Sequence, residues 1–161
     1  MKLATYSFKA DEQKRFGFVH ETYMIDILRA SAWANKTHNN YNFLHIPSSL
    51  KLALENWEPN LSYLKDLQNL VADNNIIGEQ KSLQPIATNI DDVKLYPPIT
   101  DPQSFRDFYA FEQHVKSARR LRGLDMNPDW YNLPIFYFSN PAALFGHNED
   151  ILYPKGTNEL D

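Results

Sequence analysis

The chain contains no cysteine, which excludes disulfides, thiolate metal ligands and cysteine nucleophiles. No apolar run approaches the length of a membrane span. The N-terminal segment, MKLATYSFKADEQ, lacks the apolar core of a signal peptide, because apolar and polar residues alternate and charge arrives by Asp11. No basic block is longer than Arg119 to Arg122, and the net charge is -4. These absences predict a soluble, cytoplasmic protein without a nucleic-acid or membrane partner.

The composition predicts a folded protein. The 161 residues are 43% hydrophobic and 14% aromatic, which argues against intrinsic disorder. A chain of this length can bury one substantial core or two small ones.

The first part of the chain alternates strand and helix patterns. Residues 2–8 and 16–20 alternate as half-buried strands of a hairpin, in which Gly17 marks a bulge or a close approach. A third strand from Tyr23 turns into a helix near Asp26, which is a good N-cap. A further helix follows Pro47, with Ser48 or Ser49 as its cap and with its core side formed by Leu50, Leu52, Ala53, Leu54 and Trp57.

The next helix is expected to begin at Leu61, after a break at residues 58–60. Its apolar residues recur every three to four positions, as in an amphipathic helix, at Leu61, Leu64, Leu67, Leu70 and Val71. Residues 78–89 are polar and rich in turn formers, which suggests a linker or a loose edge of the first unit. Residues 93–96 are expected to form a short strand, and the proline-rich segment 97–102 is expected to form a stiff connector. Residues 135–138 are expected to form a compact buried strand.

The segment from Ser104 to Arg122 predicts a helix on which the candidate site is built. Its apolar row is Phe108, Phe111, Val115 and Ala118. Asp107 and His114 would project from one helical face, about 10 Å apart along the axis. Such a pair could flank a small molecule or a metal complex. The plainer interpretation is a solvated carboxylate near the N-terminus of the helix and a half-buried histidine.

These residues resemble the fumarylacetoacetate hydrolase family over most of the chain. The resemblance is most specific in DFYAFEQH (107–114), DWYNLPIFYF (129–138) and ILYPKGTNELD (151–161), which occur in the family's order. It implies an α+β fold, with a small N-terminal α/β domain at 1–90 and the opening of a mixed β-roll catalytic domain at 91–161.

The resemblance implies a role for five side chains. Asp107 matches a carboxylate ligand of Mg²⁺ or Ca²⁺, and His114 matches the base that activates water. Tyr109 and Tyr137 match tyrosines that line the substrate pocket. An arginine after the histidine is expected to bind a substrate carboxylate; Arg119, Arg120 and Arg122 compete for this role, and Arg122 is our choice. The other histidines, His20, His38, His45 and His147, are interpreted as surface or structural residues.

The implied activity is metal-dependent hydrolysis of a carbon–carbon bond in fumarylacetoacetate-like or acylpyruvate-like diketo acids, by a homodimer. The family's further carboxylate ligands, its histidine-orienting acid and its substrate lysine have no counterpart in the chain, which predicts a fragment of a longer enzyme. One alternative is decarboxylation, isomerisation or hydration of 2-oxo acids in the same family. Another is a non-catalytic module for assembly. As an isolated unit, the chain is expected to expose Ile135–Phe138 and a strand edge, and to aggregate or fold only partly beyond Pro102.

Overall fold

A computed structural model describes residues 1–38, 43, 45–74, 76 and 85–157. The fold is α+β, as the sequence predicts, and it divides into two compact units. The first unit comprises Met1–Thr100 and the chain from Phe145 onward, and the second comprises Asp101–Leu144. None of the helices in the described ranges combines the length and the apolar character that a membrane crossing requires.

The first unit is built on a five-stranded antiparallel sheet in the order β4-β3-β2-β1-β5. Its strands are β1 (Lys2–Phe8), β2 (Arg15–His20), β3 (Tyr23–Asp26), β4 (Ala87–Asn89) and β5 (Val93–Leu95). The predicted hairpin is confirmed, because β1 pairs with β2 from Lys2↔Val19 to Tyr6↔Arg15. The third strand and its direct continuation into a helix are confirmed as well.

Gly17 permits a close approach within this sheet rather than a bulge, since its strand pairs without interruption on both sides. A Cβ atom at this position would lie 2.7 Å from the carbonyl oxygen of Ile25 and 2.7 Å from Sδ of Met24. It would also lie 2.8 Å from the ring of Tyr6. No larger residue fits without moving the neighbouring strand.

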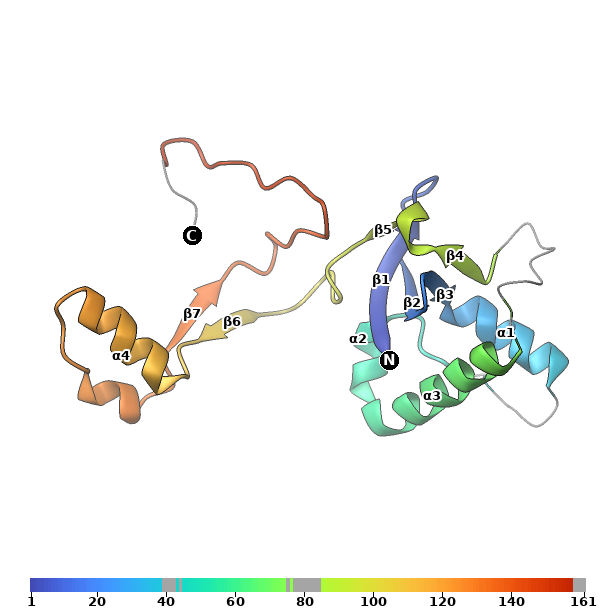
Figure 1. Cartoon of the computed structure of the whole chain (residues 1–161), viewed down its shortest axis with the longest axis horizontal. Helices are drawn as coiled ribbons and strands as arrows, with labels where there is room; N and C mark the ends of the chain where they lie inside the picture. Colours follow the sequence, from blue (N-terminus) through green and yellow to red (C-terminus); the bar gives the residue numbers. More distant parts are fainter. Residues whose placement is uncertain (39–42, 44, 75, 77–84, 158–161) are drawn as a thin grey trace. The chain divides into compact units, whose positions relative to one another are not determined.

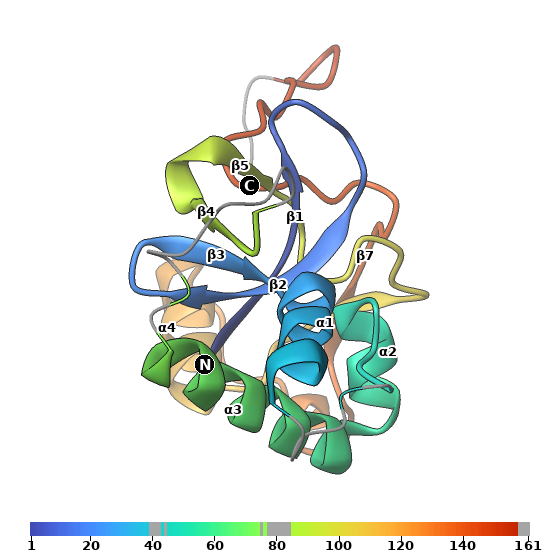
Figure 2. The same cartoon turned by 90° about the vertical axis from the view of Figure 1, so that its right-hand side faces the viewer.

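Helices α1 (Ile27–Thr37), α2 (Leu50–Glu55) and α3 (Trp57–Asp73) lie on one side of the sheet (Figures 1 and 2). Asp26 caps α1 as predicted, accepting the backbone N–H of Arg29 at 3.0 Å. Of the two candidate caps of α2, the side chain of Ser49 accepts the N–H of Leu52. Each cap satisfies a backbone donor that the helix itself cannot pair.

The predicted start of α3 at Leu61 is wrong, because the helix begins at Trp57 and runs through residues 58–60. Pro59 falls in the first turn, where its missing N–H removes no helical hydrogen bond. The side-chain amide of Asn60 donates to the carbonyl of Ala53 at 3.0 Å and links α3 to α2. A proline that looks like a helix breaker is therefore part of the helix start.

The core of this unit lies between the sheet and the helices. It contains Phe16, Phe18, Ile25, Ile27, Ala30, Ala34, Phe43, Ala53, Leu64, Leu67, Leu70, Val71, Ile76 and Ala87. The leucine stripe of α3 is thus buried as predicted, with Leu61 half-buried at its end. The predicted core side of α2 is wrong for Leu52 and Leu54, whose exposed fractions are 45% and 46%. Ala53 alone is buried, because α2 is short.

The sheet continues beyond residue 90, since β5 pairs with β1 through Tyr6↔Leu95 and Phe8↔Val93. Part of the expected linker is strand β4, and its residues 78–84 lie outside the described ranges. The chain later returns to this unit at Phe145. A side chain at Gly146 would collide with the carbonyl oxygen of Leu95, and Nζ of Lys94 lies 2.9 Å from a carboxylate oxygen of Glu149.

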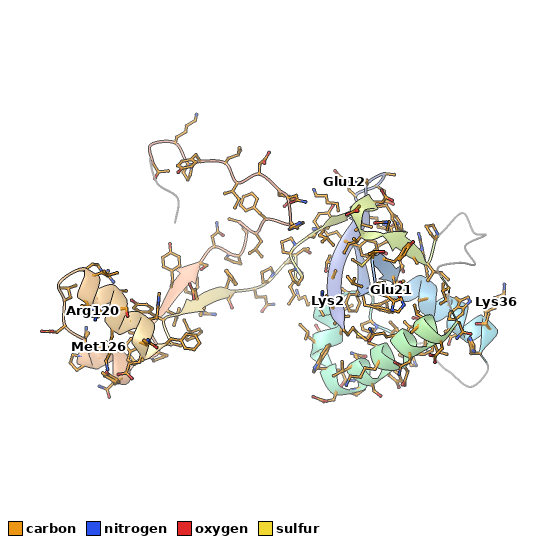
Figure 3. The ribbon with its side chains drawn as sticks, viewed as in Figure 1. Lys2, Glu12, Glu21, Lys36, Arg120 and Met126 are labelled. Atoms are coloured by element: carbon orange, nitrogen blue, oxygen red, sulfur yellow. The ribbon has the colours of Figure 1, made fainter. Side chains whose placement is uncertain are left out.

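The second unit pairs β6 (Phe105–Phe108) with β7 (Phe136–Ser139) and carries helix α4 (Glu112–Leu121) and the short helix η3 (Pro128–Tyr131) between them. The predicted strand near residues 135–138 is confirmed, but it is exposed rather than buried. Figure 3 marks Arg120 on α4 and Met126 in the irregular segment before η3.

The predicted helical start at Ser104 is wrong, because residues 105–108 form β6 and the helix begins at Glu112. The aromatic residues of this stretch suit a strand, and pairing with Phe136–Ser139 satisfies its backbone in a way that local periodicity does not reveal. Val115 is buried, as its place in the apolar row predicts. Phe108 and Phe111, from the same row, are 52% and 79% exposed.

Candidate functional site

The β6–β7 pairing places three of the expected site residues on one face of the hairpin. Asp107 lies directly opposite Tyr137 in the antiparallel register. The N–H of Tyr109 donates to the carbonyl of Ile135 at 3.0 Å, which extends the pairing by one residue. Because side chains alternate along a strand and opposite residues share a face, Asp107, Tyr109 and Tyr137 project to the same side.

Helix α4 adds His114 to this group. A hollow of about 600 Å³ within the second unit is lined by Asp107, Tyr109, His114 and Tyr137, and also by Phe108, Ala110, Phe111, Ile135 and Phe136. The ring of His114 meets that of Tyr109 edge to face, with centroids 5.5 Å apart and planes at 88°. Within the described part of the chain, the imidazole makes this ring contact and no hydrogen bond.

Asp107 and His114 therefore share a hollow, but the geometric reason predicted for it is wrong. They do not lie two turns apart on one helix, because Asp107 belongs to β6 and His114 to α4. The turn at residues 109–111 folds the helix back toward the strand. A strand, a turn and a helix bring Asp107 and His114 together, whereas the prediction placed both residues on one face of a single helix.

The short helix η3 holds this turn at two points. The indole N–H of Trp130 donates to the carbonyl of Tyr109 at 2.7 Å, and the hydroxyl of Tyr131 donates to the carboxylate of Glu112 at 2.6 Å. The sequence alone predicts neither contact. They join residues 19 to 21 positions apart, which no local pattern indicates.

The Glu112 carboxylate also pairs with Nζ of Lys116 at 2.6 Å, one helical turn away. The hydrogen bond from Lys116, followed by that from Tyr131, lowers the pKa of Glu112. Conversely, the carboxylate of Glu112 raises the pKa of Lys116 and of the Tyr131 phenol. All three groups are solvent-exposed, so they carry their usual charges at neutral pH.

The arginine expected to bind substrate does not line the hollow. Nε of Arg122 donates to the carbonyl of Ala118 at 3.2 Å, on its own helix. Nε of Arg119 donates to the carbonyl of Asp125, which closes the turn after α4. Arg120 faces a separate depression along α4. Asp107, Tyr109, His114 and Tyr137 are thus gathered in one place, and Arg122 lies apart.

The opposite face of the hairpin carries the exposed side chains of Arg106, Phe108, Phe136 and Phe138, of which Phe108 and Phe136 also border the hollow. The guanidinium carbon of Arg106 lies 5.0 Å from the ring centroid of Phe138 and 5.4 Å from that of Phe136. The Phe108 and Phe136 rings are 5.2 Å apart. Phe138 is 66% exposed. The exposure of Ile135–Phe138 agrees with the prediction for an isolated unit, whereas the contacts of Arg106 with two of these rings were not predicted.

The first unit has a buried polar cluster of its own. The hydroxyl of Tyr6 donates to Oδ2 of Asp26 at 3.0 Å, and Nε of both Arg15 and Arg29 lies 3.8 Å from the same oxygen. Burial of the phenol, with the negative charge of Asp26 beside it, strongly raises the pKa of Tyr6. Both guanidinium groups also stack against Phe8. Because Asp26 caps α1, the cluster joins sheet to helix, a structural role.

The metal expectation rests on Asp107 alone. Among the described residues no three or more histidine and acidic side chains converge as a metal-ion site would require. The hollow contributes one carboxylate and one imidazole, whereas Mg²⁺ and Ca²⁺ take six or more ligands, chiefly oxygen. These donors do not amount to a complete cation site.

The other described histidines belong to the first unit and are not among the residues that line this hollow. His38 packs edge-on against Trp33, and His147 lines a different depression together with Lys94 and Glu149. Comparison with known proteins adds no assignment: no family model and no curated protein matches the chain.

Proposed function

We propose that the chain carries part of the catalytic site of a cytoplasmic hydrolase of the fumarylacetoacetate hydrolase type, which cleaves a carbon–carbon bond in acylpyruvate-like or fumarylacetoacetate-like diketo acids. One observation supports this proposal most. The four residues singled out from the sequence for this chemistry, Asp107, Tyr109, His114 and Tyr137, line one hollow although they come from different elements. In this proposal the second unit is the opening of the β-roll domain.

His114 is the proposed base. A neutral imidazole can accept a proton from water at physiological pH. The resulting hydroxide adds to the acyl carbonyl of the substrate, and the bond between that carbon and the adjacent methylene breaks. The electron pair moves onto the methylene carbon as an enolate, which takes back the proton held by His114. One water molecule is consumed, and the products are a carboxylic acid and a 2-oxo acid.

The two tyrosines are proposed to bind and orient the substrate, and Asp107 is proposed to bind the metal ion. Tyr109 and Tyr137 present phenol groups that can donate to a substrate carboxylate or carbonyl oxygen. Asp107 is proposed to provide one ligand for Mg²⁺ or Ca²⁺, whose contribution in such reactions is to stabilise negative charge on substrate oxygens. The remaining ligands would have to come from water, substrate or groups other than the described residues.

The proposed carboxylate anchor is Arg122, which is not among the residues that line the hollow. Arg122 would have to release the carbonyl of Ala118 in order to reach a substrate in the hollow. A guanidinium remains the expected group for this role, because its fork binds a carboxylate through two hydrogen bonds.

The test is an assay of acylpyruvate hydrolysis in the presence of Mg²⁺. The decrease in the enol absorbance of the substrate measures the rate. His114→Ala should lower kcat at least about a hundredfold, because general base catalysis contributes on the order of 10²–10⁴. His20→Ala, at the end of the central strand β2 of the first unit, is the matched control and should leave kcat unchanged. Equal activity of the two variants, or no turnover with either metal by the complete enzyme that carries this chain, would contradict the proposal.

A second candidate is a non-catalytic module for assembly, including formation of a homodimer. The exposed aromatic face around Phe108, Phe136 and Phe138 favours it, since exposed apolar surface of this kind commonly marks an interaction site. Concentration-dependent association without turnover of any 2-oxo acid would support the module. Decarboxylation or isomerisation of a 2-oxo acid in place of hydrolysis would instead indicate the related enzymes of the family.

A further inference from the structure

The peptide groups of Tyr109 are held from two sides. Its N–H donates to the carbonyl of Ile135 on the β7 side at 3.0 Å, and its carbonyl accepts the indole N–H of Trp130 at 2.7 Å. Two fixed peptide groups define the direction in which a side chain leaves the backbone. The phenol ring of Tyr109 is thereby aimed at the ring of His114.

Trp130 is itself firmly placed. It lies in η3, whose start is fixed by Pro128 and by the N–H of Asp129, which donates to the side chain of Asn127 at 2.9 Å. Its ring packs edge-on against Tyr131, and Tyr131 donates to Glu112, the first residue of α4. Helix η3 therefore connects both ends of the turn that separates Tyr109 from His114.

We propose that Trp130 is a positioning residue: its indole N–H, bonded to the Tyr109 carbonyl, sets the edge-to-face geometry of Tyr109 and His114. Within the described part of the chain the exposed His114 imidazole has no hydrogen-bond partner, and its edge-to-face contact with Tyr109 is the ring contact that favours one orientation. The positioning of His114 by Trp130 follows from two contacts, the hydrogen bond between Trp130 and Tyr109 and the ring contact between Tyr109 and His114. Its catalytic consequence rests on the proposed function, in which His114 must face a bound water molecule.

Tryptophan suits this position, because it combines a hydrogen-bond donor with a broad ring. The indole N–H is a donor only, and it lies on a broad ring that reaches across the hairpin end. Phenylalanine would keep an aromatic ring but would leave the Tyr109 carbonyl without this donor. The turn could then relax, and the two rings would lose their perpendicular arrangement.

The first experiment follows the ring protons of His114 by NMR in the whole 161-residue chain. Trp130→Phe should move the His114 ring signals, because the ring current of Tyr109 acts on them, and should leave those of His20 unmoved. Trp33→Phe is the matched control. Trp33 is also half-buried and edge-on to a histidine, His38, but it lies in the first unit. Unmoved His114 signals in folded Trp130→Phe would overturn the proposal.

A second measurement needs no variant. The indole proton of Trp130 should exchange with D₂O more slowly than those of Trp33 and Trp57, which are also half-buried but have no hydrogen-bond acceptor among the described residues. If the proton of Trp130 exchanges as fast as the other two, the bond to Tyr109 is absent in solution and the inference fails. This measurement holds even if Trp130→Phe does not fold.

The kinetic readout separates this inference from the proposed function. In acylpyruvate hydrolysis, Trp130→Phe should lower kcat about tenfold with little change in KM, because misplacing a catalytic group impairs reaction more than binding. Unchanged kcat in an active enzyme would overturn the catalytic part. Shifted His114 signals in a protein that hydrolyses no acylpyruvate would support the positioning role and refute the hydrolase.

Discussion

Tyr6 and Asp26 are a buried pair that joins the sheet of the first unit to helix α1. The side chain of Asp26 accepts both the hydroxyl of Tyr6 and the backbone N–H of Arg29. Two guanidinium groups nearby offset its charge. A buried carboxylate is tolerated only when its oxygens are paired in this way. The phenol therefore contributes both a hydrogen bond and a dependence of stability on pH.

Tyr6→Phe should lower the free energy of unfolding by about 1–2 kcal/mol, because one acceptor position of Asp26 loses its donor. The difference between the two proteins should also depend on pH. Since the folded pKa of Tyr6 is raised above its usual 10.0, this stabilisation is complete below pH 10. It should fall by about 1.4 kcal/mol per pH unit above pH 10, where the unfolded phenol ionises first.

Urea midpoints of wild type and Tyr6→Phe at several pH values from 8 to 11 would measure this difference. Tyr63→Phe is the control, since Tyr63 is 42% exposed on α3. A constant difference between wild type and Tyr6→Phe across this range would show that the phenol is not held protonated by the fold.

At the level of the element, helix α2 depends on its N-cap. It has six residues and buries only Ala53, so packing contributes little to it. Ser49→Ala should destabilise the first unit by about 1 kcal/mol, because the N–H of Leu52 loses its acceptor. Ser48→Ala, one residue earlier and exposed, should change stability by less than about 0.5 kcal/mol. Thermal unfolding of the two variants makes the comparison, and equal destabilisation would contradict the assignment of the cap.

The two N-caps also show what local sequence can predict. Asp26 and the serines before α2 were identifiable because a cap is a local device, set by one side chain and the N–H two or three residues later. The hairpin of β1 and β2 was equally accessible, since alternation and a short polar turn lie within one stretch of chain.

Helix α3 and strand β6 show where the prediction failed. Residues 58–60 look like a break, yet the first turn of a helix needs no N–H from Pro59. Residues 105–108 fit a helical period, but their partner is β7, about 30 residues along the chain. A four-residue strand is decided by that distant pairing, which sequence periodicity cannot report.

The candidate site shows the same division. Asp107, Tyr109, His114 and Tyr137 were named from motifs, and they share one hollow. The contacts of Trp130 and Tyr131 with the turn could not be named, because they depend on where η3 lies. The motifs named candidate groups that share a hollow, whereas the contacts that support the turn became visible only in three dimensions.

At the level of the whole molecule, the chain leaves the first unit after Thr100 and rejoins it at Phe145. The returning segment is attached by Glu149, whose carboxylate accepts the N–H of Gly146 at 2.6 Å and pairs with Lys94. The bond from the Gly146 N–H, followed by that from Lys94, lowers the pKa of Glu149. The attachment is therefore favoured by the ionised carboxylate.

Acidification should loosen this attachment. Because the pKa of Glu149 is lowered in the folded chain, the stabilisation is complete above the usual glutamate value of 4.5 and is lost as pH falls through the lowered value. The amide signal of Gly146 should titrate in this acidic range in NMR spectra. Glu149→Gln should abolish that titration, whereas Glu21→Gln, in the β2–β3 turn, should leave it intact. Persistence of the titration in Glu149→Gln would assign it to another group.

The distribution of tryptophans between the two units determines what tryptophan fluorescence can report. Trp33 and Trp57 belong to the first unit, and Trp130 is the one tryptophan of the second. In a chain with phenylalanine at positions 33 and 57, all indole emission would originate from the residue that is bonded to the turn between β6 and α4. The fluorescence of that chain would report on the candidate site's surroundings alone, while circular dichroism of the helices would follow mainly the first unit.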